Sequence, residues 1–206
     1  MNYKEHVEKI KKICDKVEPN KVTVLTGKNG SGKSLVRKLI GIYLSEKLGI
    51  EKNKEHIVAS TSLQQRTETR ADFGAFCSVM HDDPTTPTGL ETIRKIKALL
   101  KTLSEDSKRF FVIDEPEIGM GEELVAGLVE FLNSKFSTIP EFCYGVLIIT
   151  HNRYIVENVK SDFLNLEDMS KDEWLNRKIV PTNLEEFEED SRELFRTIQN
   201  IIDSKK

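Results

Sequence analysis

The sequence predicts an α/β fold with three layers, in which helices flank a largely parallel sheet. Short runs rich in Val, Ile and Leu alternate along the chain with longer stretches of helical periodicity. Two of these runs, residues 110–114 and 144–150, are almost wholly apolar, as strands covered by helices on both faces usually are. Regular alternation of strand and helix is typical of a parallel sheet with helical crossovers. The 206 residues suit one domain.

The spacing of apolar residues defines the individual elements. Residues 3–17 have helical spacing, which the Pro-Asn pair at 19–20 ends. The amphipathic stretch 34–49 closes at Gly49, a residue favoured just past a helix. Residues 90–103 carry a stripe of Leu and Ile on one helical face. Strands are expected at 21–27, 56–60, 76–80, 110–114, 144–150 and 162–167, and helices at 3–17, 34–49, 90–103, 122–136 and 153–159.

Composition and charge argue against several classes of protein. The net charge is −3 and the pI is about 5.9, which argues against a surface coated in positive charge for nucleic acid, although a local basic patch remains compatible. No apolar run approaches the roughly 20 residues of a membrane span, and residues 1–19 are too charged for a secretory signal. The three cysteines have neither zinc-site nor disulfide spacing, so a reducing cytoplasm is expected. They are Cys14, Cys77 and Cys143.

The segment GKNGSGKS matches the phosphate-binding pattern G-x-x-x-x-G-K-[ST] and lies between a predicted strand and a predicted helix. Glycines let backbone N–H groups turn toward phosphates, and the helix directs its positive end at the same anion. Lys33 places a cation on the β- and γ-phosphates, and Ser34 offers a hydroxyl to Mg²⁺. The alternative is a glycine-rich turn that happens to contain Lys-Ser. A P-loop NTPase fold is therefore expected, with nucleotide-binding residues Gly27, Lys28, Asn29, Gly30, Ser31, Gly32, Lys33 and Ser34.

Three acids in four positions follow the apolar run FFVI. A P-loop NTPase needs a carboxylate on a neighbouring strand to hold Mg²⁺, usually through its water shell, and Asp114 suits that role. Glu115 comes next, just beyond the strand, where a carboxylate can orient a water for in-line attack on the γ-phosphate. The alternative is that these acids form a solvated cap on a strand. No chemistry requires Glu117, which is expected to be a solvated loop residue.

The order GKNGSGKS, FFVIDEPEIG and VLIITHN resembles that of the ABC-type ATPases, including the soluble branch related to chromosome-maintenance and DNA-repair ATPases. The resemblance covers residues 20–167. It implies that Glu115 is the catalytic base or water-positioning residue. It also implies that His151, after the next apolar strand, contacts the γ-phosphate and the attacking water. A histidine taken alone would more often be a surface or helix-capping residue, so its placement after VLIIT carries this interpretation.

Two further features of that family have weaker counterparts in this chain. The family's Mg²⁺-binding glutamine would be Gln64, with Gln65 or a plain polar loop as the alternatives. The signature motif, which one subunit presents to the nucleotide of the other, is best matched by PTGLE at 87–91, where a leucine stands in place of a preferred glycine. Thr88 would supply the hydroxyl and Gly89 the close backbone approach. The same stretch also fits an ordinary helix start, with a capping box from Thr88 to the glutamate three positions later.

The combined expectation is a single ABC-type ATPase domain over residues 1–206, with its motif core at 20–167 and an acidic helical extension at 170–206. The chain would bind ATP and Mg²⁺, and two chains would face head to tail as a homodimer. Nucleic acid is a compatible partner with mild support. The catalytic set would be Lys33, Glu115 and His151, and the metal-binding set Ser34, Asp114 and Gln64.

Two other functional classes fit part of the pattern. A phosphotransferase would use the same loop with a nucleoside or small-molecule acceptor, and would need an Arg-rich lid, for which residues 66–70 (RTETR) are the candidate. A non-catalytic binding module would use ATP only to close a dimer around DNA or a protein. The product separates the three classes: free phosphate, a phosphorylated acceptor, or neither.

Overall fold

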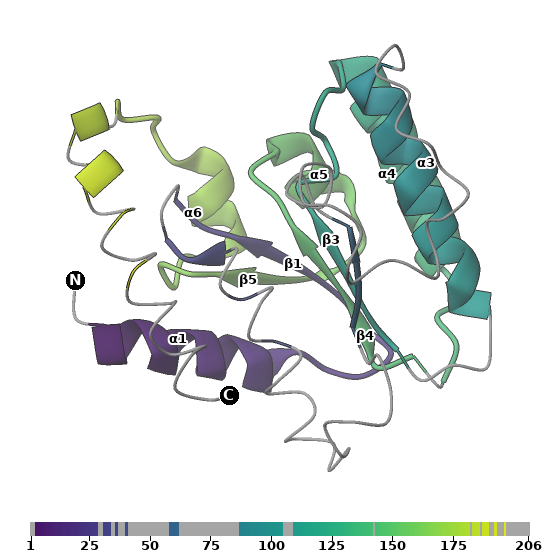
Figure 1. Cartoon of the computed structure of the whole chain (residues 1–206), viewed down its shortest axis with the longest axis horizontal. Coiled ribbons are helices and arrows are strands. Elements are labelled where there is room, and N and C mark those ends of the chain that lie inside the picture. The colour runs from purple at the N-terminus through teal and green to yellow at the C-terminus, as the bar shows by residue number, and fades with distance from the viewer. Residues whose placement is uncertain are drawn as a thin grey trace.

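A parallel sheet forms the centre of the molecule (Figure 1). The computed structural model describes residues 3–28, 31–33, 36, 40, 58–61, 87–104, 109–141, 143–181, 183–185, 187–189, 192 and 196. Within these ranges the sheet has five strands in the order β2-β3-β4-β1-β5, and each neighbouring pair is parallel. The strands are β1 (Val22–Thr26), β2 (Val58–Thr61), β3 (Phe110–Asp114), β4 (Gly145–Ile149) and β5 (Asp162–Asn165).

The α/β class and the parallel sheet predicted from the sequence are confirmed. The predicted strands at 21–27, 56–60, 110–114, 144–150 and 162–167 correspond to β1, β2, β3, β4 and β5. The strand expected at 76–80 lies outside the described residues. Of the helix expected at 34–49, the structure describes Val36 and Ile40, and both are helical.

The described helices follow the predicted ones closely. They are α1 (Tyr3–Lys16), α3 (Thr88–Lys101), α4 (Glu122–Phe136), α5 (Arg153–Asn158) and α6 (Lys171–Asn176), and a 3₁₀ turn, η2 (Thr102–Ser104), continues α3. Among the described residues, every helix is too short or too polar to cross a bilayer.

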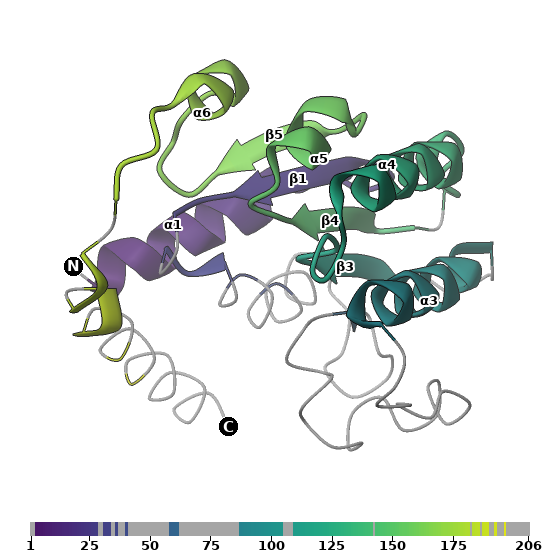
Figure 2. The ribbon, with the colours of Figure 1, turned by 90° about the horizontal axis from the view of Figure 1, so that it is seen from above.

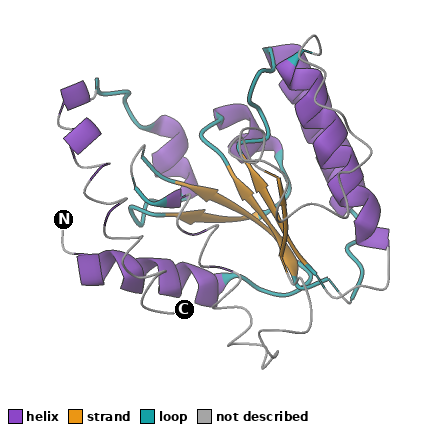
Figure 3. Cartoon of the chain, in the orientation of Figure 1, coloured by secondary structure: helices purple, strands orange, loops and turns teal. Residues whose placement is uncertain are grey.

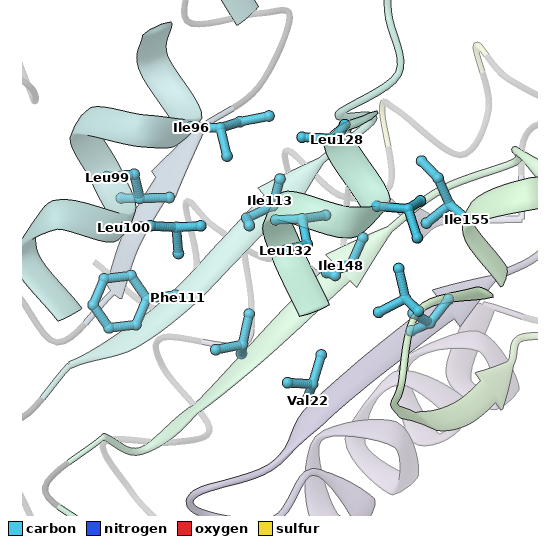
Figure 4. Close-up of a cluster of buried hydrophobic side chains, with 14 of the residues drawn as sticks. Val22, Ile96, Leu99, Leu100, Phe111, Ile113, Leu128, Leu132, Ile148 and Ile155 are labelled. Carbon is cyan, nitrogen blue, oxygen red and sulfur yellow. The ribbon is translucent and has the colours of Figure 1, made fainter. Parts of the chain in front are cut away.

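Helices cover both faces of the sheet, and each face has its own apolar core. Alternate residues of a strand point to opposite faces, so Val24 of β1 packs in one core and Leu25 in the other. Figure 3 shows the sheet between α1 and the pair α3 and α4, and Figure 2 shows α3, α4 and α5 along the sheet. Figure 4 shows the core beneath these three helices. The core beneath α1 contains Ile13, Cys14, Val17, Leu25, Val36, Ile40, Phe110, Val112, Leu147, Ile149 and Leu166.

Helix α6 is short, but one large side chain attaches it to the sheet. Trp174 is fully buried, and its ring lies 6.4 Å from that of Phe163 on β5. A capping box begins the helix, because the Ser170 hydroxyl accepts from the Glu173 amide while the Glu173 carboxylate accepts from the Ser170 amide. The first part of the predicted acidic extension therefore belongs to the folded domain.

The strand order corrects one expectation about the acidic strand. Asp114 ends β3, and β3 is not the neighbour of β1, because β4 lies between them. Adjacent strands are about 4.8 Å apart, so Asp114 lies about 10 Å across the sheet from the end of β1. All strands are parallel, so their carboxyl ends still meet at one edge.

Gly145, at the start of β4, is required by both backbone conformation and space. Its φ is +122°, and a Cβ there would lie 2.9 Å from the Glu18 carbonyl oxygen.

Gly145→Ala should lower the free energy of unfolding by roughly 1–3 kcal/mol, measured by urea denaturation. Gly127 is a matched control, because it lies exposed in α4 and a Cβ there would meet no atom within 4 Å. Gly127→Ala should stabilise by roughly 0.5–1 kcal/mol; equal effects at both sites would contradict this account.

Candidate functional site

The glycine-rich loop leaves β1 and turns directly into a helix. Gly27 is buried, and a Cβ at this position would lie 2.5 Å from the Ser31 hydroxyl oxygen. Gly32 has φ +94°, a left-handed conformation that favours glycine. The Val36 amide donates to the Gly32 carbonyl at 3.0 Å, so helical hydrogen bonding begins at Gly32. The predicted loop residues Asn29, Gly30 and Ser34 lie outside the described residues.

Lys33 is buried in this loop and is held by the loop backbone. Its Nζ donates to the carbonyl oxygens of Lys28, at 2.7 Å, and Gly27, at 3.1 Å. Burial lowers the pKa of Lys33 to about 8, and the carboxylates of Glu167, Glu115 and Asp114 oppose that shift. The ammonium group is therefore still the main form at pH 7. Carboxylates from two other strand ends lie within electrostatic reach of this cation.

The acids after β3 begin with a strained residue. Glu115 has φ +50°, which a residue with a Cβ adopts at a cost of roughly 1–2 kcal/mol. Its amide donates to the Ile149 carbonyl at 2.8 Å, so the ladder between β3 and β4 continues one residue past Asp114. Pro116 is buried, and the Ile118 amide closes a turn on the Glu115 carbonyl. The fold thus fixes the backbone that carries the Glu115 carboxylate.

The prediction that Glu117 is a solvated loop residue is wrong. Its Oε1 accepts a hydrogen bond from the Thr150 hydroxyl at 2.6 Å and from the His151 amide at 3.3 Å. Burial raises the pKa of Glu117, and these hydrogen bonds oppose the shift. The turn after Glu115 directs this side chain inward, toward the end of β4, and the sequence pattern alone did not indicate that direction.

His151 follows β4, between the loop after β1 and the acids after β3. The preceding residue, Thr150, is fully buried, and its amide donates to the Leu25 carbonyl of β1 at 3.1 Å. The following residue, Asn152, caps α5, because its side chain accepts from the Ile155 amide. Burial lowers the pKa of His151 to about 4, and the charges of Lys33 and Arg177 act in the same direction. The imidazole is therefore neutral at pH 7, with one N–H donor and one acceptor nitrogen.

Two residues at the end of β5 and just past it support the glycine-rich loop and were not predicted. The Asn165 side chain donates to the Thr26 hydroxyl at 2.9 Å, across the β1–β5 pair. The Glu167 carboxylate accepts from the Lys28 amide at 2.9 Å, at the base of the loop. An acid just past a strand was visible in the sequence, but only the position of β5 next to β1 connects it with the loop.

Arg177, just past α6, adds a cation that the sequence analysis did not single out. Its guanidinium carbon lies 4.1 Å from the centre of the Trp174 ring, and its carbonyl accepts from the Arg153 guanidinium at 2.8 Å. The Arg177 charge lowers the pKa of both Lys33 and His151, so it faces the same region of the molecule. Trp174 thus positions a guanidinium beside the site.

The predicted Thr88–Gly89 segment lies at the start of α3 and packs against the turn after the acids. Gly89 is buried, and a Cβ at this position would clash with the carbonyl oxygen of Gly119. Gly119 itself has a left-handed backbone, with φ +75°. The capping-box alternative is wrong, because Pro87 is the N-cap and no side chain caps this helix. Glu91 pairs instead with Lys95 at 2.6 Å.

Helix α3 contacts β2, at the far end of the sheet from β5. Thr88, which is exposed, therefore lies near β2, whereas the glycine-rich loop of the same chain follows β1. The predicted Gln64 and its alternative Gln65 lie outside the described residues, as does the candidate lid at 66–70.

The donor groups at this edge suit a phosphate with a divalent cation. The Ser31 hydroxyl is buried and has no hydrogen-bond partner within the described ranges, as expected for a loop that wraps an anion. Asp114 offers the single carboxylate that Mg²⁺ commonly takes from protein, the rest of its shell being phosphate and water. The residues present therefore fit a nucleotide with Mg²⁺.

Comparisons with known proteins do not identify a family. No protein-family model matches the chain, and no curated protein does. The chain is similar to a solved structure described as "Structure of ATP binding subunit of ABC transporter", with 14% identity over 85% of this chain and 90% of that one. The TM-score is 0.37, which is too low to support an assignment of fold or function.

The half-buried position of His151 gives a pH-dependent prediction. The pKa is about 4 in the folded chain and 6.5 ordinarily, so the folded state binds this proton more weakly than the unfolded state. Its contribution to stability is present above pH 6.5 and is lost as the pH falls toward 4. The free energy of unfolding of His151→Gln, measured by urea denaturation, should therefore fall less than that of wild type between pH 7.5 and about 4.5. If the difference in unfolding free energy between the two proteins did not change with pH, the lowered pKa of His151 would be wrong.

Proposed function

We propose that the chain binds ATP with Mg²⁺ at the carboxyl edge of the sheet and hydrolyses it. The observation that carries this proposal is the grouping of three strand ends. β1 leads to Lys33, β3 leads to Glu115, and β4, which lies between them, leads to His151. The span of about 10 Å from β1 to β3 leaves room for a γ-phosphate and one attacking water.

The chemistry assigns a different task to each group. The glycine-rich loop binds the phosphates through backbone N–H groups, and the Lys33 ammonium stabilises the charge that develops on the γ-phosphate. Glu115 accepts a hydrogen bond from the attacking water and takes up its proton. The water oxygen bonds to the γ-phosphorus as the bond from that phosphorus to the bridging oxygen breaks, which leaves ADP and phosphate. Neutral His151 donates its N–H to a γ-phosphate oxygen or to the water.

Asp114, Ser34 and Gln64 are the proposed Mg²⁺-binding residues. Asp114 ends β3, two strands from the loop, so it would act through the water shell of the ion. Mg²⁺ held by these residues would neutralise phosphate charge.

The proposed active form is a head-to-tail homodimer, in which each chain presents Thr88 to the nucleotide of the other. Gly89, which was predicted to act with Thr88, is buried against Gly119 of its own chain instead. This arrangement is supported by the position of α3, which contacts β2 while the phosphate loop follows β1, three strands away. Thr88 is exposed, as a residue that meets a second chain must be in the free monomer. A cytoplasmic setting and membership of the soluble ABC-type branch belong to the same proposal.

Glu115→Gln tests hydrolysis. The amide cannot take up a proton, so release of free phosphate should fall by about 10²–10³-fold while ATP affinity stays close to wild type. Lys33→Ala is the control, because it should lose ATP binding itself. Phosphate release should be measured with purified protein and no other substrate, since a phosphotransferase would release little without its acceptor. Wild-type turnover by Glu115→Gln would rule out the assigned base.

The shared site can be tested by mixing two inactive variants. Thr88→Glu places a negative charge where the partner's γ-phosphate would lie, so this variant should bind ATP but not form a dimer or turn over. Lys33→Ala keeps Thr88 but lacks the phosphate-binding cation. A mixture of the two should regain part of the ATPase activity, because one site of a mixed dimer has both intact groups. No recovery, together with full activity of Thr88→Glu alone, would show that each chain works by itself.

A further inference from the structure

The buried carboxylate of Glu117 bridges two catalytic segments after the strands have separated. The last rung between β3 and β4 is the bond from the Glu115 amide to the Ile149 carbonyl. Beyond it, the chain after β3 turns back on itself and the chain after β4 enters α5. Across this gap, Oε1 of Glu117 accepts from the Thr150 hydroxyl at 2.6 Å and from the His151 amide at 3.3 Å.

The same bridge extends to the strand that carries the phosphate loop. Thr150 is fully buried, its amide donates to the Leu25 carbonyl of β1, and its hydroxyl accepts from the Asn152 amide at 2.9 Å. The Thr150 hydroxyl is therefore fixed from both sides, as acceptor from Asn152 and donor to Glu117. Through this residue, one carboxylate connects the ends of β3, β4 and β1.

Stability alone does not account for a carboxylate at position 117. Its Oε2 is buried and has no hydrogen-bond partner among the residues that the structure describes. Leaving a buried polar atom unpaired is unfavourable, and burial of the charge adds to that cost. The side chain is thus better explained by what it holds in place.

We propose that Glu117 is a positioning residue that sets the separation and orientation of Glu115 and His151 in the hydrolytic site. This inference rests on the proposed ATPase function. Glu117 does not touch the nucleotide: it holds the His151 backbone against the turn that follows Glu115. Its effect should therefore be on the chemical step, because attack on the γ-phosphate requires both groups in place around one water.

The length of the side chain and its hydrogen-bond acceptor can be tested separately. Glu117→Ala removes the acceptor, and Glu117→Asp keeps a carboxylate but shortens the side chain by one methylene, so both should lower kcat by about 10–100-fold, as expected for small misplacement. Glu117→Gln keeps length and acceptor and should retain most of the turnover. KM and ATP affinity should stay near wild type in all three, because the phosphate loop is untouched. Urea denaturation at the assay pH confirms that each variant is folded.

Two substitutions of Thr150, the residue whose hydroxyl donates to Glu117, form a matched pair for the same test. Thr150→Ser keeps the hydroxyl and should retain turnover, whereas Thr150→Val removes it and should lower kcat to a similar extent as Glu117→Ala. The double variant Glu117→Ala with Thr150→Val should lose less than the sum of the two single losses, because each single change already removes the hydrogen bond between these two side chains. Additive losses would show that the two residues act independently and would overturn the bridge.

A second readout does not depend on ATPase activity. The His151 amide proton should be protected from hydrogen exchange in wild type and in Glu117→Gln, and should exchange at least about tenfold faster in Glu117→Ala. If wild type does not release phosphate, the proposed function fails, while the exchange pattern still reports on the bridge. Equal kcat in Glu117→Ala and Glu117→Gln, a loss confined to KM, or unchanged exchange at His151 would overturn the inference.

Discussion

The position of β4 between β1 and β3 determines the geometry of the whole site. Its residues are paired on both sides: Ile149 is in register with Leu25 of β1 and with Asp114 of β3. These three residues lie side by side in one row across the parallel sheet. The segments that follow them therefore leave the sheet at the same edge, from equivalent positions along the three strands. Because the strands are covered by apolar cores on both faces, slipping this register by one residue would move every side chain of the strand from one core to the other. The same packing that stabilises the sheet therefore fixes the points from which the segments carrying Lys33, Glu115 and His151 leave it.

Several unfavourable local features lie at this edge. Glu115 has a left-handed backbone, Lys33 is a buried cation, and Glu117 is a half-buried carboxylate whose Oε2 is buried. Each is compensated nearby: the Glu115 amide extends the ladder, two loop carbonyls accept from Lys33, and Thr150 and His151 donate to Glu117. Proteins generally tolerate such costs where chemistry needs a particular geometry.

The sequence predicted the elements well because apolar periodicity reports directly on burial. The phosphate loop and Asp114 were placed correctly at strand ends, since motif and strand are continuous in the chain. Strand order was not predictable, because no local pattern indicates that β4 inserts between β1 and β3. For the same reason Glu167 was missed: only the pairing of β5 with β1 brings it to the loop. Glu117 was misjudged because the direction of a side chain in a turn depends on the backbone angles of the residues before it. Glu115, two positions earlier, has an unusual, left-handed φ.

The charge balance of the site explains why the proposed nucleotide would need a divalent cation. Asp114, Glu115 and Glu167 all lie within electrostatic reach of Lys33, so this cation is already partly balanced before a triphosphate adds further negative charge. Arg177 contributes a second cation, but its guanidinium lies over Trp174, in an orientation set by α6. His151 adds none, because burial and both cations keep it neutral. A magnesium ion whose water shell contacts Asp114 would make this carboxylate a stabilising neighbour of the phosphates instead of a repulsive one. The glycine-rich loop would then bind the phosphates while the acids on β3 become favourable to the same ligand.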